Sequence, residues 1–141
     1  MFVSFENVVN EEDVSVQKIK YATSRLEGDK LEACFLKVET FMAKQKPYLN
    51  PDLTLPKMAD DLDVSTHHLS QVINERHGSN FFDYINRFRV EEVKRKIASK
   101  EFQNYTLLAI AMESGFNSKS AFNRVFKQIT NSTPGEYKKS L

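Results

Sequence analysis

Apolar side chains recur every three or four residues along most of this chain, which is the spacing of one face of an α-helix. The first apolar stripe runs from Leu31 to Met42 and predicts a helix over residues 29–46 that stops before Pro47. Residues 1–28 show no such period and are predicted to be a linker or the remnant of an upstream region. Because no segment has the alternating pattern and turn of a β-hairpin, we expect an all-α fold with about seven helices.

The chain also repeats itself at an offset of about 52 residues. Each copy is predicted to contain a short helix that begins at a threonine, a tight turn, and a longer helix that begins at a serine, since both residue types are favourable N-caps. The caps are Thr54 and Ser65 in the first copy and Thr106 and Ser118 in the second. This order of elements predicts two helix-turn-helix motifs.

Small and apolar residues occupy matching places in the two copies. Ala59 and Ala111 lie where the two helices of each motif must cross closely. Val64 and Phe116 lie where an apolar side chain would fill the corner between those helices. Any helical bundle can contain one such corner, but two copies with matched caps and corners indicate a duplicated motif.

A longer helix over residues 81–98 is predicted between the two copies, with Ser79 or Asn80 as its cap. At about 1.5 Å per residue this helix is about 27 Å long, and major-groove faces on one side of B-DNA are about 34–36 Å apart. Given the tilt and width of each motif, one rigid helix of this length could hold two second helices near successive turns of the groove. Phe82 on this helix and Ile129 in the second copy are expected among the core positions.

These elements predict an organisation in several parts along the chain. The parts are a linker or remnant (1–28), an approach helix and loop (29–50), a first helix-turn-helix (51–80), a linker helix (81–100) and a second helix-turn-helix (101–141). The approach helix could either pack on the first motif or pair with a second chain.

Composition and charge narrow the possible functions. Of the 141 residues 40% are apolar and 28% charged, and the single cysteine excludes a disulfide framework, so the cytoplasm is the expected location. The formal net charge is +1, but residues 1–63 hold 8 basic and 12 acidic residues, whereas residues 64–141 hold 12 and 7. A basic C-terminal half is compatible with a polyanionic partner, and also with an ordinary solvated face.

Longer runs of the sequence resemble a known family. The run 110–127, IAMESGFNSKSAFNRVFK, followed by TPGEY at 133–137, resembles the second motif in the DNA-binding domain of the AraC/XylS family of bacterial transcription regulators. The runs VSTHHLSQVI at 64–73 and FDYINRFRV at 82–90 are similar to the first motif and the linker helix of that domain. Together the resemblance covers about residues 53–139.

The resemblance implies the fold and the partners that this chain is expected to have. The fold is two helix-turn-helix subdomains joined by a long linker helix, and the partner is double-stranded DNA, read by two recognition helices in successive major grooves. RNA polymerase is a further expected partner. The resemblance also implies that the chain is the output domain of a longer protein with an upstream sensor domain, which in full-length form could be a homodimer and could be tethered to the inner membrane.

Polar residues near the start of the second helix of each motif must reach base edges if these helices enter the major groove. Gln71 and Asn123 carry the amide that pairs with adenine, and Arg124 carries the guanidinium that pairs with guanine. The resemblance places the predicted contacts, with the exception of Asn74, at base-contacting positions of the family. For each of them an ordinary solvated face is the alternative. The predicted base-contacting residues are His67, Ser70, Gln71, Asn74, Lys119, Ser120, Asn123 and Arg124.

Phosphate contacts are predicted at two helix starts and at one lysine. Thr54 and Thr106 mark helix N-termini whose backbone N–H groups could face a phosphate, and Lys127 adds a positive charge. The second helix of the first motif has no lysine and carries Glu75, whereas its counterpart has two lysines and an arginine. We therefore expect the second motif to contribute more of the salt-dependent affinity.

Other chemistry finds little support in the sequence. His67 and His68 point about 100° apart on a helix and His77 is distant, so neither a metal nor a cofactor is expected. No nucleophile or acid–base arrangement indicates an enzyme. Arg89 and Arg95 are expected to be structural. A helical protein-interaction module is the alternative function, but polar, neutral-to-basic second helices favour DNA over an apolar partner surface.

Overall fold

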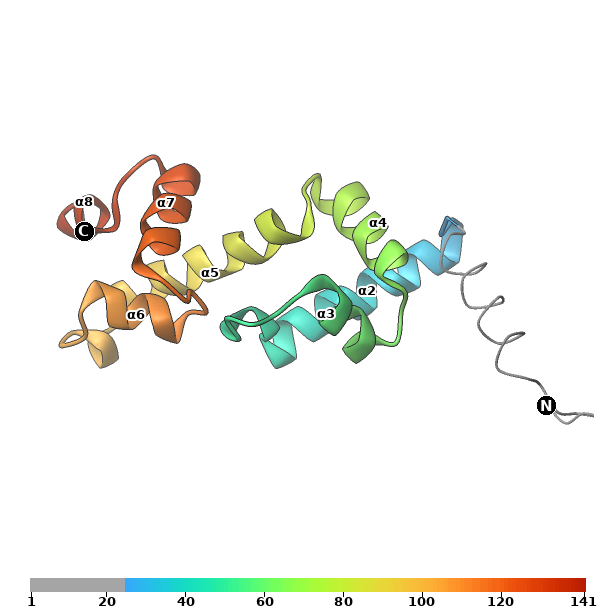
Figure 1. Ribbon diagram of the computed structural model, residues 1–141, viewed down its shortest axis with the longest axis horizontal. Helices are drawn as coiled ribbons and strands as arrows, with labels where there is room; N and C mark the ends of the chain where they lie inside the picture. The colour runs from blue at the N-terminus through green and yellow to red at the C-terminus, as the bar shows by residue number, and fades with distance from the viewer. Residues whose placement is uncertain (1–24) are drawn as a thin grey trace, which may run out of the picture.

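The computed structural model describes residues 25–141, and this part of the chain is all-α, as the sequence predicts (Figure 1). Two short 3-10 helices, η1 (Pro47–Leu49) and η2 (Lys100–Phe102), were not predicted. The expectation that residues 1–28 form a linker falls, for residues 1–24, outside the described residues. The α-helices are α2 (Gly28–Gln45), α3 (Leu55–Leu62), α4 (Thr66–His77), α5 (Phe81–Ile97), α6 (Leu107–Glu113), α7 (Lys119–Thr130) and α8 (Pro134–Lys139).

The predicted caps form at the start of both motifs' longer helices. Ser65 Oγ accepts a hydrogen bond from the His68 N–H at 3.0 Å, and Ser118 Oγ accepts one from the Ala121 N–H at 3.1 Å. Such a cap is worth about 1 kcal/mol. Asn80, one of the two residues expected to cap α5, is its N-cap. The starts of these helices are thus fixed by local sequence.

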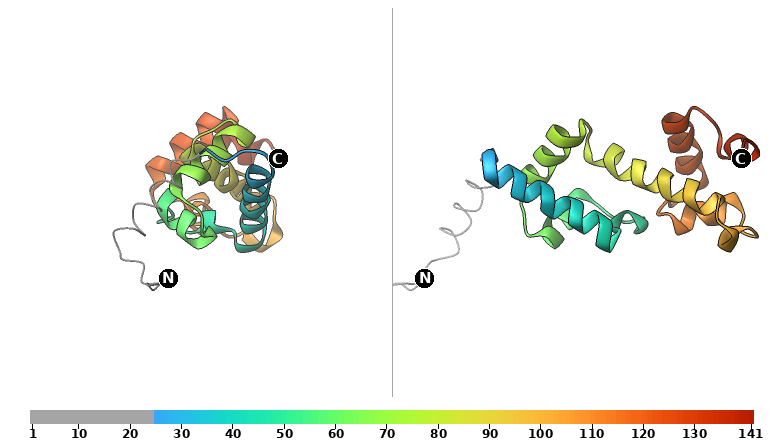
Figure 2. Two further views of the ribbon diagram at one scale, coloured as in Figure 1. Left: turned by 90° about the vertical axis from the view of Figure 1, so that its right-hand side faces the viewer. Right: turned by 180° about the vertical axis from the view of Figure 1, so that it is seen from behind.

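The described part of the chain has two separate apolar cores. Figure 2 shows the two groups of helices that surround them at opposite ends of α5. The first core joins α2, α3 and α4 to the start of α5 through Phe81, Tyr84 and Ile85. The second joins α6 and α7 to the later turns of α5 through Val90 and Val93. The approach helix α2 packs on α3 and α4 of its own chain, the first of the two arrangements expected for it.

Two residues expected in the core are exposed instead. Phe82 is 69% exposed, because Phe81 occupies the inward position at the start of α5 and the next residue points about 100° away around the helix. Ile129 is 37% exposed, since it lies in the last turn of α7, beyond the buried Val125 and Phe126. The helical period was predicted correctly in α5 and α7, but the apolar positions of each helix extend beyond the residues that its core buries.

The two halves meet where Gly115 approaches η1. The Arg89 guanidinium on α5 donates from Nε to the Tyr48 carbonyl oxygen at 2.7 Å and from Nη2 to the Asn50 carbonyl oxygen at 2.9 Å. Burial lowers the pKa of Arg89 from its ordinary value. Gly115 has a φ of 103°, and a Cβ at this position would lie 2.1 Å from the Tyr48 carbonyl oxygen. Arg89 is therefore structural, as expected, and only glycine fits opposite it.

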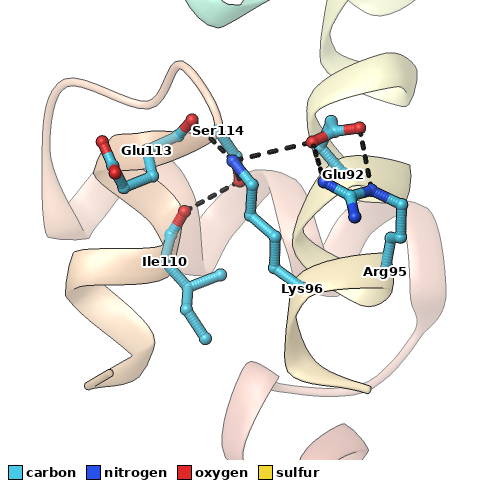
Figure 3. A network of polar contacts seen from close by, with 6 residues as sticks. All are labelled: Glu92, Arg95, Lys96, Ile110, Glu113 and Ser114. Atoms are coloured by element: carbon cyan, nitrogen blue, oxygen red, sulfur yellow. Dashed lines mark hydrogen bonds and ion pairs between the residues drawn. The ribbon is translucent and has the colours of Figure 1, made fainter. Parts of the chain in front are cut away.

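A buried polar network fastens the end of α6 to α5 (Figure 3). Lys96 is buried, and its Nζ donates to the Glu113 carbonyl oxygen at 2.7 Å and lies 3.6 Å from Glu92 Oε2. Ser114 Oγ donates in turn to the Ile110 carbonyl oxygen at 2.8 Å. Because the last carbonyls of a helix lack partners within it, this lysine satisfies one of them. The second motif is thereby held against the linker helix.

The Glu92 carboxylate completes this network and is held in its charged form. Burial alone would raise its pKa, but the hydrogen bond and charge of Arg95, together with the charges of Lys96 and Lys46, outweigh burial, so the pKa of Glu92 lies below its ordinary value. Arg95 is thus structural too, pairing with Glu92 at 3.1 Å. A carboxylate whose pKa is lowered by folding stabilises the fold above its unfolded pKa, and this stabilisation is lost as pH falls through the folded pKa.

We expect Glu92→Gln to destabilise the chain at pH 7 by about 1.5–3 kcal/mol, because charged hydrogen bonds are lost. Below the ordinary value of 4.5 the Glu92 carboxyl of the unfolded chain takes up a proton, and at still lower pH that of the folded chain does too, so the difference between the two proteins should shrink as pH falls. Urea denaturation at pH 7 and pH 3.5 measures it. Glu91→Gln, which removes an exposed charge one position earlier, is the control. A Glu92→Gln loss of equal size at both pH values would contradict a role for the charged pairs of Glu92 with Arg95 and Lys96.

Candidate nucleic-acid interface

The second helices of the two motifs lie on the same side of the molecule. In Figures 1 and 2, α4 and α7 lie on one side of α5 and α3 and α6 on the other. Helix α5 has 17 residues and is therefore about 25 Å long. It contributes to both cores, so it sets the separation of α4 from α7. A single elongated ligand could contact both helices from this side.

On α7 the predicted residues form one polar surface. Lys119, Asn123 and Lys127 are exposed and lie four residues apart, which places them in one row along the helix. Arg124 is exposed beside this row, and all four line a groove of about 640 Å³ between α7 and the starts of α6 and α8. Ser120, the remaining residue predicted here, is exposed as well. The structure therefore brings together the basic and amide groups that the sequence singled out on α7.

The α7 groove is positively charged. Lys119, Arg124 and Lys127 line it together with apolar and uncharged polar residues, and no acidic side chain is among its lining residues. Within residues 25–141, none of the three cations lies within ion-pair distance of a carboxylate. Their charges are therefore available to an anionic ligand.

On α4 most, but not all, of the predicted residues face solvent. His67, Ser70 and Asn74 are exposed. Gln71 is only 9% exposed, so the expectation that it presents its amide to a base is not met in this structure. The cause is the chain that precedes α2, which lies against this part of α4.

Gln71 is engaged by hydrogen bonds on both sides of its amide. The Leu26 N–H donates to Gln71 Oε1 at 2.9 Å, and Gln71 Nε2 donates to the Leu26 carbonyl oxygen at 2.8 Å. Gln71 Nε2 also donates to Glu75 Oε2 at 2.9 Å, and Arg25 Nη2 lies 2.5 Å from the same oxygen. The acidic residue that the sequence placed on this helix is thus paired with a cation from outside the motif.

The residues predicted to contact phosphates begin or flank helices. Thr106 Oγ1 caps α6 by accepting from the Ala109 N–H at 3.0 Å, and Thr54 Oγ1 caps α3 by accepting from the Lys57 N–H at 3.3 Å. Both threonines are exposed. The start of α6 also lines the groove that contains Lys127, which brings two of the predicted phosphate contacts to one region.

Two residues at this surface were missed by sequence reasoning. Leu108 is half-exposed and lines the α7 groove. In the internal repeat Leu108 corresponds to Pro56, which is not a core position of the first copy. This mismatch could have indicated that Leu108 lies at the surface. Arg25 was missed because its partner Glu75 lies 50 positions away along the chain, and no sequence pattern links residues at that separation.

No group of three or more His, Cys, Asp or Glu side chains among residues 25–141 is arranged to hold a metal ion. None of the helices in that range combines the length and hydropathy that crossing a bilayer requires.

Known proteins resemble this chain both in sequence and in the arrangement of its helices. The model of a family described as "Helix-turn-helix domain" matches residues 58–140. An uncharacterized HTH-type transcriptional regulator of Staphylococcus aureus (strain COL) is 31% identical over 91 residues, which cover 64% of this chain and 12% of the relative. The chain therefore spans about an eighth of the length of such curated relatives.

Solved structures show the same arrangement of helices. The C-terminal domain of AraT, a response regulator from Geobacillus stearothermophilus, is 25% identical with a TM-score of 0.68, over 80% of this chain and 89% of that one. The C-terminal domain of the two-component response regulator yesN from Fusobacterium nucleatum is also 25% identical, with a TM-score of 0.57, over 76% of this chain and 98% of that one.

Proposed function

This chain belongs to the AraC-type family of helix-turn-helix transcription regulators, and from that premise we propose that α4 and α7 enter two successive major grooves of one DNA duplex. DNA binding in transcription regulation is the function of the family, which is not a family of enzymes. The observation that carries the finer proposal is the placement of two serine-capped helices on the same side of one rigid helix (Figure 1).

Helix α7 supplies the stronger half of the proposed interface. Arg124 pairs with a guanine through its two-pronged guanidinium, and Asn123 pairs with an adenine through its amide. Lys119 and Ser120, in the first turn, reach neighbouring bases. The exposure of all four side chains and the absence of acidic residues from the α7 groove support this assignment.

Helix α4 supplies a weaker half, since none of its proposed base-contacting residues is a lysine or an arginine. His67, Ser70 and Asn74 are the exposed residues available for base edges. Gln71 joins them when its amide is released from Leu26. Because α4 offers amide, hydroxyl and imidazole groups but no lysine, we propose that its contacts add sequence preference and little salt-dependent affinity.

Phosphate contacts would fix the position of each motif on the duplex. We assign Lys127, the N-terminus of α6 at Thr106 and that of α3 at Thr54 to this role. With α5 about 25 Å long and major-groove faces about 34–36 Å apart, the width of the motifs must make up the difference, or the duplex must bend toward the protein.

The place of this chain in a longer protein is also a proposal. We assign residues 29–50 to an approach helix and loop, 51–80 and 101–141 to the two motifs, and 81–100 to the linker helix. The Staphylococcus aureus relative is about eight times longer than the region that matches this chain, which covers 12% of it. We therefore propose that the chain is an output domain that works in the cytoplasm with an upstream sensor domain, that RNA polymerase is its further partner, and that the full-length protein forms a homodimer and is tethered to the inner membrane.

Selection of duplexes from a random DNA pool by the 141-residue chain tests the proposed function. We expect enriched duplexes to share two half-sites whose centres lie about 10–10.5 base pairs apart, since that is one helical turn. Washing at two salt concentrations removes non-specific duplexes and serves as the control. Enrichment of a single half-site would contradict the use of both motifs, and a failure to enrich any sequence would favour the protein-interaction alternative.

A further inference from the structure

The chain immediately before α2 lies on the first recognition helix. We call Arg25–Glu27 the latch segment. The backbone N–H and carbonyl of Leu26 pair with the Gln71 amide through hydrogen bonds of 2.9 and 2.8 Å, in the manner of two neighbouring strands. Both groups of one backbone residue are therefore satisfied by one side chain, 45 positions away.

A second contact holds the latch segment to the same helix. Arg25 Nη2 lies 2.5 Å from Glu75 Oε2, and this oxygen also accepts from Gln71 Nε2. Gln71 and Glu75 are four residues apart, so they lie on one face of α4. The segment is thus fixed by a backbone pair and an ion pair on adjacent turns, and this combination distinguishes it from a chain that merely passes the helix.

Docking of the latch segment and recognition of a base both use the side-chain amide of Gln71. A glutamine recognises adenine through its Oε1 and Nε2 together. In this structure Leu26 occupies both atoms, and the side chain is buried under the segment. One amide cannot form both pairs, so the segment must leave before Gln71 enters a groove. His67, Ser70 and Asn74 stay exposed while it is docked.

We propose that the latch segment competes with DNA for Gln71 and so regulates the affinity of the first motif. This inference rests on the proposed function, because it takes α4 as a DNA-reading helix. The segment joins α2 to the chain before residue 25, so a displacement originating upstream changes the availability of one reading side chain. The apparent affinity of the first motif for DNA is then multiplied by the fraction of molecules in which the latch segment has left Gln71.

Arg25→Glu tests this competition because its two effects on DNA binding have opposite signs. The new carboxylate repels Glu75 and opens the latch, which should tighten binding about 3- to 10-fold to the duplex selected by the native chain. The added negative charge alone should weaken binding. Lys30→Glu makes the same charge change at an exposed position of α2 and is the matched control, expected to bind no more tightly than the native chain. Weaker binding by Arg25→Glu, to the same extent as by Lys30→Glu, would overturn the proposal.

A double variant shows whether the gain passes through Gln71. In a Gln71→Ala background, Arg25→Glu should no longer tighten binding, since no amide remains to be released. An equal gain in both backgrounds would mean that the segment acts by another route, and it too would overturn the latch.

Amide hydrogen exchange at Leu26 reports the latch directly. In the free native chain this N–H should exchange slowly, and Gln71→Ala should remove its protection. Saturation with the selected duplex should also remove it. A chain that binds the duplex yet keeps Leu26 protected would overturn the latch and leave the proposed function standing. A chain that binds no duplex would overturn both.

Discussion

Gly115→Ala is expected to destabilise the chain by about 3 kcal/mol or more, since it adds backbone strain to a steric clash. The φ of 103° lies in a region that residues with a Cβ rarely adopt. The added methyl would also meet the Tyr48 carbonyl oxygen at 2.1 Å and Arg89 Nε at 2.7 Å, and a backbone carbonyl shifts at a higher cost than the end of a flexible side chain. Chemical denaturation followed by circular dichroism measures the loss.

Two other glycines separate the causes of this loss. Gly78 has a φ of 63° with no atom within 4 Å of a Cβ, so Gly78→Ala should show the backbone strain alone. Gly135 lies in α8 with ordinary φ and open space, so Gly135→Ala should be neutral or slightly stabilising. Equal losses for Gly115→Ala and Gly78→Ala would show that the contact with η1 contributes nothing.

Arg124→Ala is expected to weaken binding to the selected duplex by about 1–3 kcal/mol, or about 5- to 150-fold, if the guanidinium reads a guanine. The loss should be confined to duplexes that carry the preferred base at one position, because other duplexes never gained that pair. Fluorescence anisotropy with the selected duplex and its single-base variants measures both effects. The side chain is exposed, so the thermal midpoint of the free chain should not change.

Lys127→Gln is the matched comparison for that variant. Lys127 lines the same groove one turn further along α7, but as a phosphate contact it should weaken binding to all duplexes alike. The slope of the logarithm of the binding constant against the logarithm of salt concentration should fall by about 0.9. If Arg124→Ala also acted uniformly on all duplexes, Arg124 would be a phosphate contact and the assignment of base reading to it would be wrong.

Local sequence was sufficient to predict most of the fold. Helix starts depend on a capping side chain and the backbone N–H groups next to it, so Ser65, Asn80 and Ser118 could be identified without tertiary information. The repeat then related the two motifs to each other. The exposed positions of Phe82 and Ile129 could not be predicted in this way, because periodicity gives the direction of a side chain but not the extent of the core.

The candidate site was predictable where it depends on one helix and less so where it depends on distant chain. On α7 the spacing of Lys119, Asn123 and Lys127 places them in one row whatever surrounds the helix. On α4 the burial of Gln71 depends on its hydrogen bonds to Leu26, and nothing in the composition of either segment indicates that the two residues are in contact. The buried lysine contact of α5 with the end of α6 was missed for the same reason.

Because the two apolar cores share α5, a destabilising substitution in one core should also affect the other. Phe81 and Tyr84 belong to one core and Val90 and Val93 to the other, yet consecutive helical turns carry them all. Unfolding of either core would destabilise α5, and the other core also packs on α5. The two cores should therefore unfold cooperatively. A destabilising substitution in one core will therefore weaken DNA binding by both motifs. Loss of DNA binding will not by itself show which core carries the substitution.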